Sequence, residues 1–206
     1  MSMSQTPATQ RLTQHQVSPA IAMLSRAFFH DPFSVYLYPD DEERTRRLPL
    51  LWSIPVRYSA RSGEVTTTAD LTGAACWLPP DEKGIGVAYL LRSGILSAAL
   101  RMGTRARQRM VKAQAYLTQA HQRYMSEPHW YLWILGVEPA CQGKGIGGTL
   151  LRAGLARADT AQMPCYLETM NAENVPLYEH FGFVVADEGT IPGSDVRTWY
   201  MIRPAN

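Results

Sequence analysis

Short apolar runs alternate along the chain with segments of helical spacing, and the pattern predicts a mixed α/β fold. Residues 63–69 and 72–78 are two β-prone runs on either side of a polar turn, which predicts a hairpin. Residues 129–137 and 165–170 are two further apolar runs with a helical segment between them. A strand, a helix and a second strand in this order predict a parallel pair joined by a right-handed crossover.

The N-terminal part of the chain is predicted to be mostly helical. Residues 11–15 predict a short strand, and a helix follows with Ser18 as its cap and stops at Asp31-Pro32. A second helical segment covers 41–61, and its two internal prolines, at positions 49 and 55, should kink or break it.

Residues 84–126 contain no proline and predict helix, with Gly94 and Gly103 as breaks between segments. One face of the last segment should be buried because apolar residues recur on it every three or four positions, namely Met110, Ala113, Leu117, Ala120 and Tyr124. The other face is basic and is interpreted as solvated rather than as a site for an acidic substrate; it carries Arg105, Arg107, Arg109 and Lys112. A short helix at 176–182 and a closing antiparallel pair of strands complete the pattern.

Length and composition limit the functional classes. A chain of 206 residues with 46% hydrophobic residues is expected to form one domain, over residues 1–206. A net charge of +2 does not predict binding to nucleic acid or membranes, and no apolar run is long enough for a transmembrane helix. Cys76, Cys141 and Cys165 show no metal-ligand spacing, so we expect reduced thiols and no metal site. The N-terminus lacks signal-peptide features, and we expect a cytoplasmic protein.

A glycine-rich stretch between the strand at 129–137 and the next helix is the strongest chemical signal. It places Gly143, Gly145, Gly147 and Gly148 within six positions. Glycine leaves the backbone N–H groups bare at a helix N-terminus, where the helix dipole favours an anion such as a diphosphate. The alternative is a tight turn that serves packing alone.

The spacing of these glycines leaves the phosphate ligand open. Gly143, Gly145 and Gly148 satisfy the dinucleotide pattern G-x-G-x-x-G, and Glu168 stands where a ribose-binding acid is found. Two features count against that pattern, because residues 138–142 separate the strand from the first glycine and too little chain follows Glu168 for a second nucleotide-binding half. A Walker loop is excluded because Gly145, not Ser or Thr, follows Lys144.

Two linked motifs resemble the GNAT superfamily of acyl-CoA-dependent N-acyltransferases. Its diphosphate loop, Q/R-x-x-G-x-G/A after a V-x-P strand end, matches Val137-Glu138-Pro139 and Gln142 to Gly147. Its second signature matches Asn171 and Asn174 followed by Leu177-Tyr178 and Phe181-Gly182-Phe183. The segments AFFHDP, ACWLPP, EPHWYLWILGV, CYLET, LYEHFGF and RTWYM are more narrowly similar to the puromycin N-acetyltransferase-like group.

The resemblance implies a GNAT fold, in which helices flank a mixed, mostly antiparallel sheet whose central parallel strands splay apart. It places a helical insertion at about 84–126 and a CoA-binding core at about 129–183. It implies transfer of an acetyl group from acetyl-CoA, with no metal, directly to the amine of a small molecule. Three functional alternatives remain: a protein or peptide N-acetyltransferase, a non-enzymatic CoA-binding protein and an NAD-dependent enzyme. A homodimer is a separate possibility for the assembly.

The resemblance also assigns roles to residues. The backbone N–H groups of Leu135 and Val137 would hold the thioester and the pantetheine arm, and Gly136 between them predicts a bulge or a close approach of backbone. The predicted cofactor-binding residues are Leu135, Gly136, Val137, Gln142, Gly143, Lys144, Gly145, Ile146, Gly147, Gly148, Asn171 and Asn174, although either asparagine could instead cap the following helix.

Tyr178 is the predicted general acid in this scheme. Glu168 is the predicted general base by its position, with a structural carboxylate as the alternative and His129 as a weaker candidate. Aromatic walls of the acceptor pocket are expected at Phe29, Tyr36, Tyr38 and Trp77, for each of which a core position is the alternative.

Overall fold

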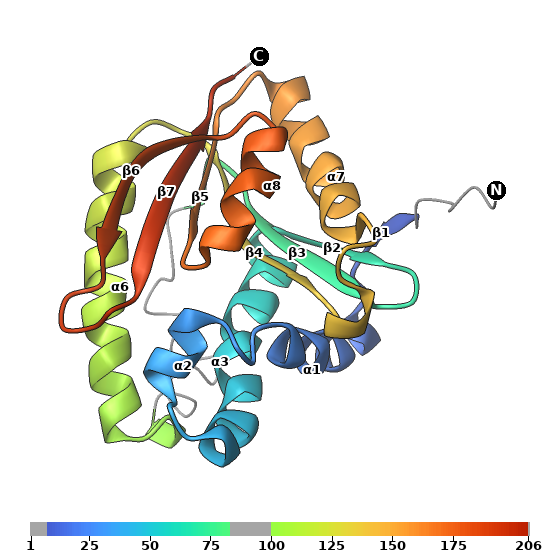
Figure 1. The fold of residues 1–206 in the computed structure, drawn as a ribbon. Helices are drawn as coiled ribbons and strands as arrows, with labels where there is room; N and C mark the ends of the chain where they lie inside the picture. The colour runs from blue at the N-terminus through green and yellow to red at the C-terminus, as the bar shows by residue number, and fades with distance from the viewer. Residues whose placement is uncertain (1–7, 83–99, 206) are drawn as a thin grey trace.

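A computed structural model describes residues 8–82 and 100–205. Its centre is a seven-stranded sheet in the order β1-β2-β3-β4-β5-β7-β6 (Figure 1). Among the described strands only β4 and β5 run parallel, and the other neighbours are antiparallel, which confirms the predicted mixed sheet. The strands are β1 Thr9–Arg11, β2 Glu64–Thr68, β3 Gly73–Leu78, β4 Trp130–Val137, β5 Cys165–Thr169, β6 Val184–Thr190 and β7 Arg197–Arg203.

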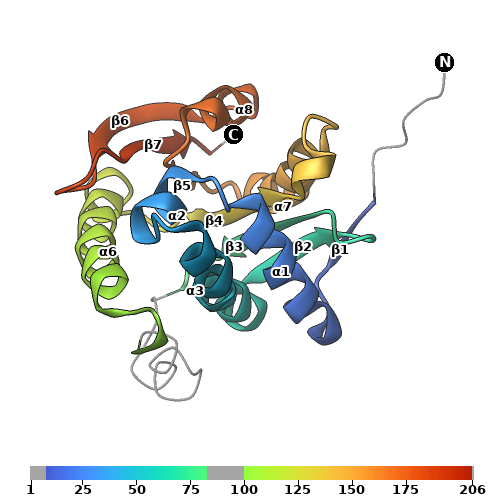
Figure 2. The same ribbon diagram turned by 60° about the horizontal axis from the view of Figure 1, so that its bottom comes forward.

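Helices cover both faces of the sheet, as Figure 2 shows. Helices α1 and α3 pack against β3 on one face, whereas α7 packs against β2, β3 and β4 on the other. Helix α6 contacts α2 and β7. The helices are α1 Val17–Ala27, α2 Pro32–Leu37, α3 Asp41–Ser62, α6 Thr104–Tyr124, α7 Ile146–Ala161 and α8 Val175–His180, with 3₁₀ turns at Gln14–Gln16, Pro139–Cys141 and Ala172–Asn174.

Each face of the sheet has its own hydrophobic core. Leu24 and Leu48 belong to the cluster beneath α1 and α3, and Leu151 and Leu167 belong to the cluster beneath α7 and α8. All four side chains are at most 1% exposed. The sheet is therefore held from both sides, which fixes the positions of β4 and β5 for the site described below.

The N-terminal boundaries differ from those predicted. The first strand ends at Arg11, because Thr13 and Gln16 cap each other and turn the chain into a 3₁₀ turn. Helix α1 then begins at Val17 with Gln16 at its cap, so that Ser18 lies in its first turn and is not the cap. The helix ends at Ala27, and Asp31-Pro32 instead starts α2, with Asp31 as its N-cap.

The prolines at positions 49 and 55 were predicted to kink or break helix α3; the helix continues through both, so it is not broken. A proline inside a helix costs about 3 kcal/mol because it removes one hydrogen bond and crowds the preceding turn. Burial of Leu48, Leu51 and Val56 against the sheet offsets this cost, and Asp40 caps the first turn by accepting from the Glu43 N–H at 2.7 Å.

Helix α6 begins directly after Gly103, whose φ of 82° suits glycine, and the predicted break there is confirmed. The predicted buried face is confirmed at its centre, where Ala113, Leu117 and Ala120 are buried. On the basic face, Arg109 is not simply solvated, because it donates to the Tyr36 carbonyl at 2.6 Å and ties α6 to α2. Gly94 and the predicted helix before residue 100 lie outside the described residues.

The described helices are too short or too polar to cross a lipid bilayer.

Candidate active site

Strands β4 and β5 pair at their first residues and then separate. Trp130 lies opposite Cys165 and Tyr131 lies opposite Tyr166, after which the pairing ends although β4 continues to Val137. The N–H of Glu138 donates to Thr72 at 2.8 Å, on the β3 side. Successive residues of a strand direct their N–H groups to opposite edges. Since the N–H of Glu138 faces β3, those of Val137 and Leu135 face the gap beside β5. The gap therefore offers two aligned donors.

The bulge in β4 lies at Trp133 and not at Gly136. Leu132 pairs with Trp77 and Ile134 pairs with Cys76, which leaves Trp133 as the extra residue, whereas Gly136 pairs regularly with Ala74. Gly136 instead permits a close approach, since a Cβ there would lie 2.5 Å from Leu24 Cδ2 and 2.9 Å from Phe28 Cε2. The end of α1 consequently lies against the strand at the gap.

The glycine loop opens the N-terminus of α7. Gly145 is the cap residue in a left-handed conformation with φ 78°, and the Thr149 N–H donates to its carbonyl at 3.0 Å. The N–H groups of the first turn have no partner within the helix. A Cβ at Gly147 would make only ordinary contacts, 3.8 Å from Leu177 and Val137, so packing does not require glycine there. Because Gly147 has no Cβ, a ligand can approach the unpaired N–H groups at the start of α7.

A groove of about 580 Å³ runs between the end of α1, the end of β4, the glycine loop and α8. The predicted cofactor-binding residues line it except Lys144, which is exposed and whose Nζ donates to the Ala140 carbonyl at 2.9 Å. Bare amides at a helix N-terminus suit a diphosphate, and the unpaired edge of β4 suits an extended arm. The groove thus meets the requirements of coenzyme A, whose diphosphate would lie at α7 and whose arm would lie beside β4.

The two asparagines differ in what their side chains do. Asn171 Oδ1 accepts from the Glu173 N–H at 3.1 Å and caps the short turn before α8, which was the predicted alternative. Asn174 precedes α8 without a side-chain capping bond and lines both the groove and the cavity next to it. Asn174 is therefore the better placed of the two to reach a ligand.

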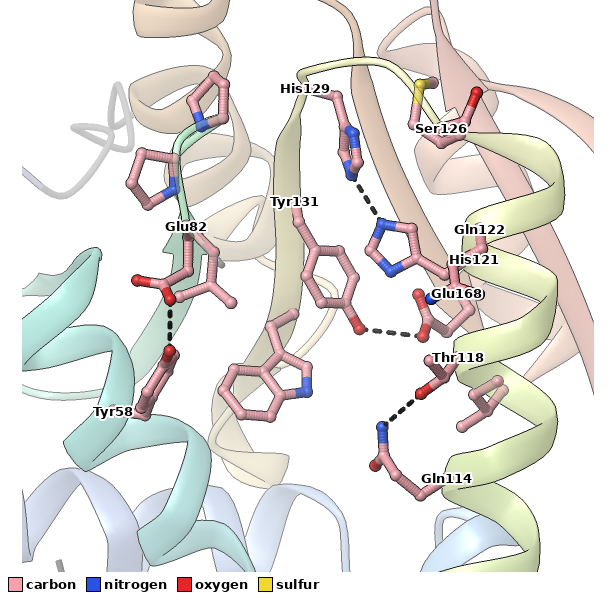
Figure 3. A pocket seen from close by; sticks show the side chains of 16 residues that line it. Tyr58, Glu82, Gln114, Thr118, His121, Gln122, Ser126, His129, Tyr131 and Glu168 are labelled. Carbon is pink, nitrogen blue, oxygen red and sulfur yellow. Dashed lines mark hydrogen bonds between the residues drawn. The ribbon is translucent and has the colours of Figure 1, made fainter. Parts of the chain in front are cut away.

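The groove continues into an inner cavity of about 260 Å³. Tyr178, Asp31 and Leu135 line both spaces, and Glu168 lines the inner cavity from the side of β5. An outer cavity of about 680 Å³ follows, and Glu168 and Tyr131 line both the inner and the outer one. The predicted acid and base thus face the same inner cavity, between the groove and the outer cavity shown in Figure 3.

Glu168 has one engaged and one unengaged carboxylate oxygen. Its Oε1 accepts a hydrogen bond from the Tyr131 hydroxyl at 2.9 Å, whereas Oε2 is buried and has no hydrogen-bond partner among the described residues. Burial raises the pKa of Glu168 to about 7, although the Tyr131 bond opposes this. A carboxyl group with a pKa near neutrality in the wall of a cavity is suited to take a proton.

Tyr178 is a buried phenol, 6% exposed. Burial, and secondly the charge of Asp31, raise the pKa of Tyr178 well above its ordinary value, so the hydroxyl keeps its proton. Asp31 was not predicted as a site residue. It accepts from the Phe33 N–H at 2.9 Å as the cap of α2, and burial raises its pKa to about 6.

The four aromatic residues considered as walls of the acceptor pocket do not line the inner or the outer cavity, and the core position given as their alternative is the one observed. Tyr38 and Trp77 are fully buried in the cores, Phe29 lies under the Arg44 guanidinium, and Tyr36 lies under that of Arg109. Other aromatic side chains line the inner and outer cavities, namely Phe28, Phe33, Trp52, Tyr58, Tyr131 and Trp133. Their placement depends on the bulge in β4 and on the packing of α1 to α3.

Comparison with known proteins gives the family. Residues 28–183 match the family model described as acetyltransferase (GNAT) family. The chain belongs to the GNAT family. An uncharacterized N-acetyltransferase of Schizosaccharomyces pombe is 30% identical to this GNAT protein over 183 residues, which covers 86% of this chain and 74% of that one.

Solved structures show the same GNAT fold. A structure from Corynebacterium glutamicum, described as histone acetyltransferase HPA2 and related acetyltransferase, superposes with a TM-score of 0.69 at 23% identity and covers 98% of this chain and 97% of its own. Arylalkylamine N-acetyltransferase 2 from Aedes aegypti gives a TM-score of 0.68 at 12% identity, with 97% and 99% covered. At these identities the likeness establishes the fold.

Proposed function

We propose that this GNAT protein transfers the acetyl group of acetyl-CoA directly to the amine of a small molecule. The observation that carries the proposal is that Tyr178 and Glu168 line the same inner cavity. Tyr178 also lines the groove at α7, and Glu168 also lines the outer cavity. A donor in the groove and an acceptor in the outer cavity would meet between these two side chains.

The chain's own donors would hold and orient the cosubstrate. Acetyl-CoA supplies an activated thioester when it is bound. The amides of the first turn of α7 bind the diphosphate, and the N–H groups of Leu135 and Val137 face the thioester and the arm. A preorganised donor aimed at a developing oxyanion contributes about 3 kcal/mol to the stabilisation of the transition state.

Glu168 and Tyr178 would move or hold the protons. An amine is an ammonium ion near neutral pH and must lose a proton before it attacks, and Glu168, which lines both cavities, accepts that proton. Tyr178 donates a hydrogen bond to the departing sulfur and passes its proton to it while taking up the second proton of the attacking nitrogen. The two transfers have to be coupled, because burial and the charge of Asp31 disfavour a free phenolate.

The composition of the cavities supports a cationic acceptor with an apolar body. Glu168 and Asp31 supply carboxyl groups, and no lysine or arginine is found among the described residues that line the inner and outer cavities. Aromatic walls suit the apolar part of an amine. The Aedes structure is that of an arylalkylamine N-acetyltransferase, and the narrower resemblance to the puromycin-type group suggests puromycin as another acceptor.

A panel assay tests the proposal. Release of free thiol from acetyl-CoA is measured with phenethylamine, agmatine, spermidine, puromycin and a lysine peptide, and calorimetric titrations with CoA and with NAD run beside it. We expect CoA binding and turnover with at least one small amine. CoA binding without any turnover would leave a non-enzymatic binder, turnover with the peptide alone would favour a protein acetyltransferase, and binding of NAD alone would overturn the proposal.

A further inference from the structure

Two histidines lie at the outer cavity and take no part in the proposed chemistry. His121 comes from α6 and His129 immediately precedes β4, and both line the outer cavity. Figure 3 shows His121 between His129 and the hydrogen-bonded pair of Tyr131 and Glu168. His121 thus lies next to the proposed base without a hydrogen bond to it.

The hydrogen bonds of the pair fix which nitrogens carry protons. His129 Nδ1 lies 2.6 Å from the Glu127 carbonyl oxygen, which can only accept, so Nδ1 donates. His129 Nε2 lies 2.7 Å from His121 Nε2, and one of these two must donate to the other. If both rings are neutral, His129 Nε2 accepts, His121 Nε2 donates, and His121 Nδ1 is left with a lone pair.

The surroundings favour neutral rings. Burial lowers the pKa of His121 to about 4, with a further contribution from His129, and burial also lowers the pKa of His129. The His121 ring is stacked on Tyr166 with centroids 4.2 Å apart and lies 4.8 Å from the Tyr131 ring. Its Nδ1 makes no hydrogen bond to a described residue. The His121 ring is therefore fixed in place, and its Nδ1 has a lone pair that can accept a hydrogen bond.

A role as the next proton carrier after Glu168 does not fit these values. A proton on Glu168, with a pKa of about 7, would be about 10³-fold less favoured on His121, with a pKa of about 4. A neutral nitrogen with a lone pair at a cavity wall is instead suited to recognise a donor group of a ligand.

We propose that His121 determines acceptor specificity, its Nδ1 accepting a hydrogen bond from a hydroxyl or N–H on the body of the acceptor while the reacting amine lies at Glu168. The inference rests on the proposed function. It specifies the acceptor as an amine whose apolar body, placed against Tyr131 and Trp133, carries a second donor group. His129 acts as a positioning residue, because it fixes the tautomer of His121.

The test compares matched acceptors within each variant. The probes are phenethylamine and its three ring-hydroxylated isomers, and the readout is the ratio of kcat/KM for the best isomer to that for phenethylamine, so that a general loss of activity cancels. We expect a ratio of about 10 in the unaltered protein, the value of one net hydrogen bond. His121→Phe keeps an aromatic ring against Tyr166 but lacks the acceptor, and its ratio should fall to about 1.

Two further variants separate recognition from structure. His121→Asn places an amide oxygen near the former Nδ1 and should recover part of the ratio. Gln119→Ala, at an exposed position of the same helix, should retain the full ratio. Circular dichroism and thermal melts show that each variant is folded.

The inference is overturned if His121→Phe keeps the full ratio, or if the unaltered protein shows no preference for any hydroxylated isomer. It is also overturned if all four probes fail while another amine of the panel reacts, an outcome that leaves the proposed function standing. Absence of turnover with every amine would overturn both, so the two failures are distinguishable.

Discussion

Replacement of Glu168 by glutamine tests the proposed base by activity and by stability at once. The amide has the shape of the carboxyl group and can still accept the bond from Tyr131, but it cannot take a proton or carry a charge. Glu168 is half-buried as a residue, and its Oε2 is shielded from solvent. The substitution therefore removes the chemistry and leaves the packing almost unchanged.

The expected loss of activity follows from the pKa of Glu168, about 7. The ionised fraction is then about 9% at pH 6 and about 91% at pH 8, so kcat/KM should rise about tenfold between these values. Glu168→Gln should lower kcat/KM about 10²- to 10⁴-fold, the usual contribution of a general base. It should also abolish the rise of kcat/KM with pH, which is the acidic limb of the pH–rate profile.

The expected gain in stability has the opposite sign. The pKa of Glu168 is raised from 4.5 in the unfolded chain to about 7 in the fold. Between these values the folded state binds more protons than the unfolded state, so the free energy of unfolding falls as the pH rises. At pH 8 the buried charge costs at most about 3 kcal/mol, since one pKa unit is about 1.4 kcal/mol.

Kinetics between pH 5.5 and 9, and urea unfolding at pH 4.5 and pH 8, provide the assay. Glu168→Gln should be more stable than the unaltered protein at pH 8 and equal to it at pH 4.5. An unchanged acidic limb in the variant would exclude Glu168 as the base. Equal stability at both pH values would show that Glu168 is not an uncompensated buried carboxyl.

Three other substitutions probe the same site. Tyr178→Phe should lower kcat by about 10²-fold or more while calorimetry finds CoA binding retained, and unchanged turnover would remove Tyr178 from the mechanism. Gly147→Ala should leave the melting temperature unchanged, because the added Cβ makes only ordinary contacts. It should weaken CoA binding about tenfold, because the methyl group crowds the amides of α7. An unchanged Kd would show that the ligand does not approach these amides. Tyr131→Phe removes the bond that lowers the pKa of Glu168, so the acidic limb should move to higher pH, and a limb that stays or moves down would contradict the assigned hydrogen bond.

Local signals in the sequence were enough to predict the centre of the fold. Strands β4 and β5 and the start of α7 could be predicted from short segments of sequence. Strand alternation and helix capping depend on neighbouring residues alone. The motifs around Gln142 and Tyr178 then identified candidate cofactor-binding residues that, except for Lys144, line one groove. The residues of that unit lie where the pattern predicted them.

Features that depend on tertiary packing could not be predicted in this way. The bulge at Trp133 follows from the register against β3, and no residue type marks it. The sequence pattern identified Asp31 only as the end of the first helix. Its proximity to Tyr178 depends on the close approach of α1 to β4 at Gly136. The choice between core and cavity wall stayed open for Phe29, Tyr36, Tyr38 and Trp77, because an aromatic residue in the core and one at a cavity look alike in sequence.

A crystal structure with bound CoA tests the central claim most directly. We expect the diphosphate within hydrogen-bonding distance of the amides between Gly143 and Gly148, the arm along β4 beside Val137, and the sulfur next to the Tyr178 hydroxyl. A diphosphate bound away from the start of α7, or a sulfur outside the inner cavity, would contradict the proposed site.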